Sequence, residues 1–152
     1  MIQPGDTAPD FTLPATPDTT VTLSELRPSR VVLFFYPKDM TPGCTDEAIG
    51  FSAAEADFAK AGVRIVGVSK DSLKRHQNFI AKHPVSVPLA SDAESDTCER
   101  YGVWGEKKMM GRSYLGIIRS TFLIGPDGTV EKVWSPVRVK GHVAEVLAAV
   151  TG

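Results

Sequence analysis

Cysteine is the residue type that stands out in this sequence, because a thiolate is a strong nucleophile and only Cys44 and Cys98 occur among 152 residues. Thr41, a good helix-capping residue, and Pro42, favoured in the first helical position, come just before Cys44. The sulfur is therefore expected in the first turn of a helix, where unpaired backbone N–H groups and the helix dipole stabilise an anion. We predict that the pKa of Cys44 falls below the free-thiol value of about 8.5, and that Cys44 is a nucleophile rather than a small buried hydrophobic residue.

Two acidic residues oppose this effect. Asp46 and Glu47 bring negative charge near the same sulfur and would raise the pKa of its thiol. The sequence therefore requires a fixed cation beside Cys44 to offset them.

The chain around Cys44 is expected to run from a buried strand into a helix. Residues 31–36 form a continuous apolar, β-branched and aromatic run that ends at Pro37, as in a strand buried on both faces. Beyond Cys44, apolar residues recur at helical spacing until Gly62, which predicts one helix of about four turns. Cys44 should therefore lie where the strand gives way to the helix.

The rest of the chain alternates predicted strands and helices and closes with a hairpin and a helix. The expected elements are a hairpin in 11–24, a strand at 63–68, a helix at 72–82, a short strand at 87–89, a short helix at 95–101, a hairpin at 119–134 and an amphipathic helix around 143–150. This order predicts an α/β, thioredoxin-like fold with a mixed central sheet, helices on both faces and an N-terminal β-hairpin extension at one edge. We see no repeat and no linker, so we expect a single domain over residues 1–152.

Composition excludes several functional classes. The formal net charge is -1, which leaves no basic field for nucleic acid or an anionic membrane, and no stretch approaches the ~20 apolar residues of a membrane span. The start of the chain has no leader pattern, and two cysteines are too few for a secreted disulfide scaffold. None of the three histidines lies near a cysteine in sequence. We therefore expect a cytoplasmic protein without a metal or a cofactor.

The segment around Cys44 resembles the active-site signature of the peroxiredoxins, P-x-x-x-T-x-x-C. Residues 35–45 read FYPKDMTPGCT, so that Pro37, Thr41 and Cys44 match the signature. Further blocks resemble the bacterioferritin-comigratory, or Q-type, branch of the family: GDTAPDF at 5–11, YGVWGEK at 101–107, MG at 110–111 and GIIRSTFLI at 116–124. Four ordered blocks over most of the chain make this resemblance specific.

This resemblance implies a thioredoxin fold and a thiol-dependent peroxidase that reduces hydrogen peroxide and alkyl hydroperoxides through a sulfenic acid at Cys44. By family position, the Thr41 hydroxyl, the Cys44 backbone N–H and the Arg119 guanidinium donate hydrogen bonds to the peroxide, and Pro37 shields the thiolate from water. Arg119 would also be the cation that Asp46 and Glu47 require. Glu47 either orients Arg119 or stabilises the first turn of the helix.

The sequence departs from this branch at the resolving cysteine, the second thiol that captures the sulfenic acid. Many Q-type members carry it five residues after the reactive cysteine, and others carry it on the next helix, but here these positions are Ile49 and approximately Ile80. We expect a one-cysteine mechanism, with Cys98 as a small buried residue and with thioredoxin, glutaredoxin or glutathione as the reductant. We expect a monomer or a weak dimer.

Other functions stay open at this point. Cys98 could resolve the sulfenic acid in an atypical two-cysteine enzyme, or join two subunits. The chain could also be a non-enzymatic thioredoxin-like sensor or binding module in which Cys44 is oxidised once. A dithiol oxidoreductase is excluded, because Thr41 and Glu47 stand where a Cys-x-x-Cys motif would need its second cysteine.

Overall fold

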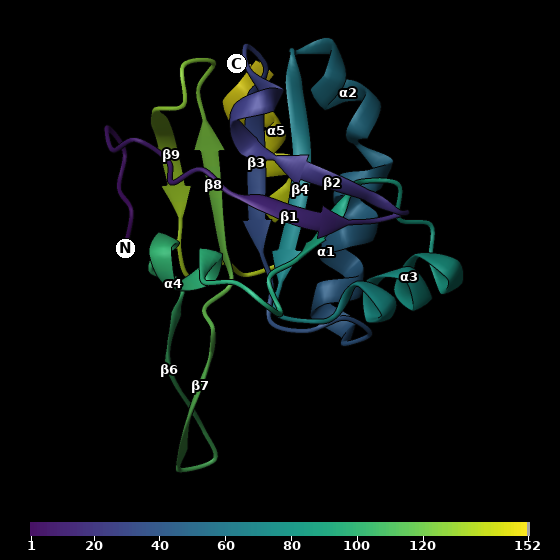
Figure 1. Ribbon diagram of the computed structural model, residues 1–152, viewed down its shortest axis with the longest axis vertical. Coiled ribbons are helices and arrows are strands. Elements are labelled where there is room, and N and C mark those ends of the chain that lie inside the picture. Colours follow the sequence, from purple (N-terminus) through teal and green to yellow (C-terminus); the bar gives the residue numbers. More distant parts are fainter. Residues whose placement is uncertain (152) are drawn as a thin grey trace.

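The computed structural model describes residues 1–151, apart from the side chain of Met109, and shows an α/β protein built on one large sheet (Figure 1). The large sheet has seven strands in the order β2-β1-β5-β4-β3-β8-β9, and a separate two-stranded sheet joins β6 to β7. Along the chain the elements are β1 (Thr12–Ala15), β2 (Thr19–Thr22), the 3-10 helix η1 (Leu23–Leu26), β3 (Arg30–Phe35), α1 (Pro42–Ala53), α2 (Glu55–Lys60), β4 (Val63–Ser69), α3 (Leu73–Lys82), β5 (Leu89–Ser91), α4 (Thr97–Tyr101), β6 (Trp104–Met109), β7 (Arg112–Ile117), β8 (Ser120–Ile124), β9 (Val130–Trp134) and α5 (His142–Thr151).

The sheet is mixed, and β3 lies inside it. Strand β3 pairs in parallel with β4 and antiparallel with β8, and its residues 31–35 and the following Tyr36 are all buried. The N-terminal hairpin β1–β2 forms one edge, as the sequence predicts, and β9 forms the other. The predicted hairpin near the C-terminus is also present, as β8 and β9.

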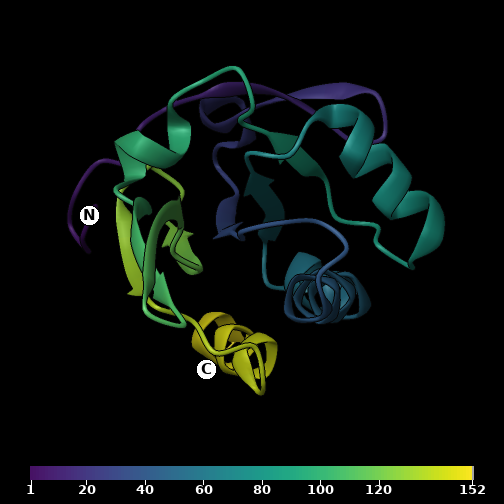
Figure 2. The same ribbon diagram turned by 90° about the horizontal axis from the view of Figure 1, so that it is seen from below.

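Helices cover both faces of this sheet (Figure 2). Strand residues alternate between two separate cores, because successive side chains of a strand point to opposite faces. Val31, Leu33 and Phe35 belong to the first core, with α4 and the N-terminal segment. Their neighbours Val32, Phe34 and Tyr36 belong to the second core, with α1, α2 and α5. Helix α3 packs against β5 and β1.

Two elements differ from the sequence-based expectation. The single helix predicted after Cys44 is interrupted at Ala54, which separates α1 from α2, and no glycine or proline near this point signals the break. The hairpin β6–β7, which projects from the body of the protein in Figure 1, was not predicted. Its two-residue turn has positive φ at both Met110 (53°) and Gly111 (78°). Such turns favour Asn-Gly or Gly-Gly, so a methionine there hides the signal.

No helix in residues 1–151 is both long enough and apolar enough to cross a membrane.

Candidate active site

Cys44 lies in the first turn of α1, directly after the loop that leaves β3. The helix begins with Thr41 as its N-cap residue and Pro42 in the first turn, and only 1% of Cys44 is exposed. The Thr41 side chain does not cap the helix; its hydroxyl donates to the carbonyl oxygen of Lys38 at 2.8 Å. Thr41 thus leaves the first-turn N–H groups without a capping side chain, and they can bind an anion or a polar ligand beside the sulfur.

Arg119 brings a positive charge to this sulfur from the other side of the site. It lies between β7 and β8, and its Nη2 atom donates to the Sγ atom of Cys44 at 3.1 Å. Its Nη1 atom is 2.6 Å from Oε1 of Glu47. Burial alone would lower the pKa of Arg119, but the charges of Glu47 and Cys44 raise it above its usual value, so the guanidinium stays charged.

Glu47 is the acidic residue that faces the site, whereas Asp46 is exposed to solvent. The carboxylate of Glu47 is fully buried, and its Oε2 atom has no hydrogen-bond partner among the residues that the structure describes. Burial raises the pKa of Glu47 to about 7, although Arg119 opposes this shift. Of the two negative charges expected near the sulfur, only that of Glu47 acts inside the protein, because water screens Asp46.

This buried carboxyl group gives a testable pH dependence of stability. In the unfolded chain Glu47 ionises near its ordinary pKa of 4.5, while in the folded protein it keeps its proton up to about pH 7. The free energy of unfolding should therefore fall as the pH rises through this window, by about 3 kcal/mol, and then level off. Urea denaturation from pH 5 to 8 should show this slope in the parent and a smaller one in Glu47→Gln. Asp46→Asn is the matched control and should keep the slope; equal slopes in the parent and in Glu47→Gln would contradict the assignment.

Gly43 is a site residue that the sequence analysis missed. A Cβ atom built on Gly43 would lie 3.3 Å from the Nη2 atom of Arg119 and 3.8 Å from a methyl carbon of Val139. The guanidinium therefore passes closely over the backbone of the first turn, and a side chain at this position would push it away. In the sequence, only the position of this glycine directly before Cys44 could have indicated that another group passes close to the backbone here.

The loop between β3 and α1 carries Pro37 and Thr41, and its backbone is strained. Pro37 is half-buried and lies two residues after the end of β3. Met40 has a φ of 69°, in the left-handed region that costs a non-glycine residue about 1–3 kcal/mol. Such a conformation persists only when the surrounding structure holds it, and it sets the direction in which Thr41 enters the helix.

A second cation reaches the site from the hairpin β6–β7. The Nζ atom of Lys107 donates to the carbonyl oxygen of Ile117 at 2.8 Å. Burial and then the charge of Arg119 lower the pKa of Lys107, while Cys44 acts in the opposite direction. Lys107 was not predicted, because the hairpin that carries it was not.

Cys98 lies on the opposite face of the sheet from Cys44. It belongs to the first core and is fully buried, whereas Cys44 belongs to the second. The backbone N–H of Cys98 donates to Oδ2 of Asp92 at 2.8 Å, and burial, followed by the charge of Asp92, raises the pKa of the Cys98 thiol far above its usual value. Both cysteines are free. Contact between the two sulfurs would require the sheet to open.

Ile49 and Ile80 both line one surface groove between α1 and α3, so the two positions expected to hold a resolving cysteine carry apolar side chains. Neither side chain can react with a sulfenic acid.

The sequence of the chain is similar to those of known proteins. Residues 4–133 match the family described as AhpC/TSA. The chain is 47% identical over 146 residues to a putative peroxiredoxin bcp of Coxiella burnetii, covering 96% of this chain and 97% of the relative, and 46% identical over 146 residues to the peroxiredoxin Bcp of Bacillus subtilis, covering 96% and 93%.

Solved structures agree with these relatives. A bacterioferritin comigratory protein of Xanthomonas campestris, studied for its alkyl peroxide reduction activity, superposes with a TM-score of 0.86 at 45% identity and covers 92% of this chain and 89% of its own. A cysteine-to-serine mutant of PrxQ from Xylella fastidiosa gives a TM-score of 0.92 at 38% identity, covering 98% and 95%. The predicted thioredoxin-like α/β fold is thereby confirmed.

Proposed function

Because the chain belongs to the AhpC/TSA family and is a thiol peroxidase of the Bcp, or Q-type, branch of the peroxiredoxins, we propose that Cys44 is the thiol that reduces the peroxide. The observation that carries this proposal is the guanidinium of Arg119, 3.1 Å from the Sγ atom of Cys44 in the first turn of α1. A helix N-terminus and a charged guanidinium both stabilise a thiolate.

The proposed step is a displacement at oxygen. The Cys44 thiolate attacks one oxygen of ROOH, an S–O bond forms, the O–O bond breaks, and the leaving RO⁻ takes up a proton from the medium. Sulfur is oxidised to a sulfenic acid, and the peroxide is reduced to water or an alcohol. Negative charge spreads over sulfur and both oxygens in the transition state, so fixed donors aimed at these atoms accelerate the reaction.

Each neighbour has a proposed role in that step. Arg119 and the backbone N–H of Cys44 donate to the peroxide oxygens, and Pro37 limits the access of water to the sulfur. The Thr41 hydroxyl donates its hydrogen bond to the carbonyl oxygen of Lys38, so in this conformation its oxygen accepts a hydrogen bond from the O–H of the peroxide rather than donating to it. Glu47 orients Arg119 through the 2.6 Å contact.

Family membership implies a peroxide as substrate and a thiol as reductant. We propose that hydrogen peroxide and alkyl hydroperoxides are the substrates of this chain, since alkyl peroxide reduction is named for the Xanthomonas campestris relative.

We further propose that the sulfenic acid is reduced by the one-cysteine route. The separation of Cys98 from Cys44 by the sheet, and isoleucine at positions 49 and 80, support reduction of the sulfenic acid by thioredoxin, glutaredoxin or glutathione. Two free cysteines suit a reducing cytoplasm, and we propose a monomer or a weak dimer there.

The mass of the protein after one equivalent of peroxide tests this route. We expect a chain heavier by one oxygen atom, trapped at Cys44 by a reagent specific for sulfenic acids. An internal disulfide would instead support the atypical two-cysteine enzyme, and a linked dimer would place the second thiol in another subunit. Continued consumption of peroxide with added thiol separates an enzyme from a sensor that is oxidised once.

Cys98→Ala should leave turnover with thioredoxin unchanged. The residue is fully buried in the core away from Cys44, so its loss should lower the free energy of unfolding by about 1 kcal/mol and do little else. Steady-state turnover and urea denaturation measure the two effects. A variant that stalls as the Cys44 sulfenic acid and over-oxidises to the sulfinic acid would show instead that Cys98 resolves.

A further inference from the structure

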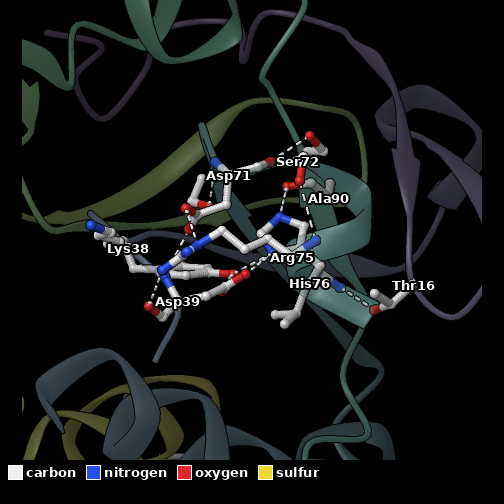
Figure 3. A network of polar contacts seen from close by, with 12 residues as sticks. Thr16, Lys38, Asp39, Asp71, Ser72, Arg75, His76 and Ala90 are labelled. Carbon is white, nitrogen blue, oxygen red and sulfur yellow. Dashed lines mark hydrogen bonds and ion pairs between the residues drawn. The ribbon is translucent and has the colours of Figure 1, made fainter. Parts of the chain in front are cut away.

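A histidine without any motif context lies in the interior next to the Cys44 loop. This histidine is His76, on helix α3. In the structure it points from α3 toward Asp39 in the loop that leads to α1 (Figure 3). His76, Asp39 and Tyr36 all have 0% exposure. A buried polar cluster is costly compared with apolar side chains of similar size, so its geometry needs an explanation.

The three side chains form a closed set of hydrogen bonds. Tyr36 donates its hydroxyl proton to Oδ1 of Asp39 at 2.6 Å, and Oδ2 of Asp39 contacts Nδ1 of His76. The Nε2 atom of His76 lies 3.1 Å from the carbonyl oxygen of Ala90, which can only accept, so Nε2 carries a hydrogen. The contact between Oδ2 and Nδ1 must then hold one further proton, on either atom. Each polar side-chain atom of these three residues therefore has a hydrogen-bond partner.

The backbone of Asp39 is held as firmly as its side chain. Its N–H donates to Oδ2 of Asp71 at 2.7 Å, and its carbonyl oxygen accepts from Arg75 at 3.1 Å. Arg75 also lies 3.0 Å from the other carboxylate oxygen of Asp71. Figure 3 shows these contacts converging on Asp39 from α3 and the residues just before it. Three of the four polar atoms of Asp39 are therefore bound by residues 71–76.

Asp39 lies immediately before Met40 and Thr41, the part of the loop that leads into the first turn of α1. Met40, the next residue, has the positive φ of 69°, and Thr41 after it is the N-cap residue of α1. A left-handed conformation at a methionine needs fixed neighbours, and Asp39 supplies one of them. A shift of Asp39 would turn the Thr41 hydroxyl and the first-turn N–H groups away from the reacting atoms, while leaving Arg119 in contact with the sulfur.

We propose that Asp39, His76 and Tyr36 are positioning residues of the peroxidase reaction: they fasten the Cys44 loop to α3 and so fix the orientation of Thr41 and the first turn of α1. They touch neither the peroxide nor the sulfur. The proposal rests on the role proposed for Cys44.

Two rate constants separate positioning from plain stability. Reaction of Cys44 with hydrogen peroxide depends on aligned donors, whereas alkylation by iodoacetamide depends mainly on the thiolate. Misplacement of about 1 Å can slow an oriented reaction by up to about 100-fold, so Asp39→Ala and His76→Leu should lower the peroxide rate constant by about tenfold or more and leave the alkylation rate constant nearly unchanged. Tyr36→Phe, which removes only one hydroxyl, should act in the same direction more weakly and serves if the other variants fold poorly. Asp39→Asn should restore the rate, because its amide can accept from Tyr36 and donate to Nδ1 of His76.

Asp92→Ala is the matched control. Asp92 is equally buried and holds the backbone N–H groups of Thr97 and Cys98, but it belongs with the core on the other face of the sheet. It should lose stability and keep the ratio of the two rate constants. The proposal is overturned if Asp39→Ala and His76→Leu keep the parent ratio, if Asp92→Ala loses it equally, or if Asp39→Asn is as slow as Asp39→Ala. The mass of the parent after peroxide, read separately, tests Cys44 itself.

Discussion

Replacing Cys44 with serine should reduce peroxide turnover to the background rate while the fold stays intact. The hydroxyl of serine has a far higher pKa than a thiol, so neither the first turn of α1 nor Arg119 can make it an anionic nucleophile near neutral pH. The two side chains are similar in size and the position is buried, so packing changes little. Peroxide consumption with added thioredoxin measures the loss, and circular dichroism with urea denaturation checks the fold.

Cys98→Ser is the matched control for that experiment. It places the same hydroxyl in the other core, and it should cost stability but keep turnover, because Cys98 lies on the far face of the sheet. Substantial activity in Cys44→Ser, or loss of activity in Cys98→Ser with an intact fold, would show that Cys44 is not the thiol that reacts with the peroxide.

The second large effect is expected for Arg119→Ala, which should slow the reaction of Cys44 with hydrogen peroxide by about 100- to 1,000-fold. Loss of one fixed donor to a developing anion has this magnitude in other enzymes. The change also leaves the buried carboxyl group of Glu47 without its cation. Both the thiolate and the transition state lose stabilisation, so alkylation by iodoacetamide at pH 7 should slow as well, but less than the peroxide reaction.

Two further variants test which property of Arg119 accounts for the slower reaction of Arg119→Ala. Arg119→Lys keeps the charge but not the planar fork that spans Sγ of Cys44 and Oε1 of Glu47, so it should recover only part of the rate. Adding Glu47→Gln to Arg119→Ala replaces a buried carboxyl group, which without Arg119 keeps its proton at neutral pH, by a neutral amide, and it should not recover the peroxide rate. Unchanged alkylation and peroxide rates in Arg119→Ala would remove this residue from the site.

Local patterns predicted the elements that position Cys44. Thr41 and Pro42 lie within three residues of the sulfur, so the start of the helix could be predicted from residue preferences at these positions, although the Thr41 side chain does not cap the helix. The apolar run at 31–36 predicted the buried strand β3, because burial on both faces removes the usual alternation. The hairpin β8–β9 followed from its turn residues.

Contacts between segments that are distant in sequence could not be predicted from such local patterns. The acidic residues after Cys44 required a cation, but only the family resemblance named Arg119, 75 residues away in sequence from the sulfur that it contacts. Nothing near His76 indicates that its partner is Asp39, 37 residues earlier. The hairpin that carries Lys107 was missed because β7 is largely exposed and the turn begins with Met110 instead of asparagine or glycine.

Because the two cysteines lie in cores on opposite faces of one sheet, the number of reactive thiols also reports whether the protein is folded. In the role proposed for Cys44, this thiol meets small solutes at the first turn of α1, whereas Cys98 is sealed by packing that disappears only when the chain unfolds. A thiol count taken with and without denaturant therefore reports the intact fraction of a sample. A probe attached through Cys44 likewise labels a single known position without any engineering of the sequence.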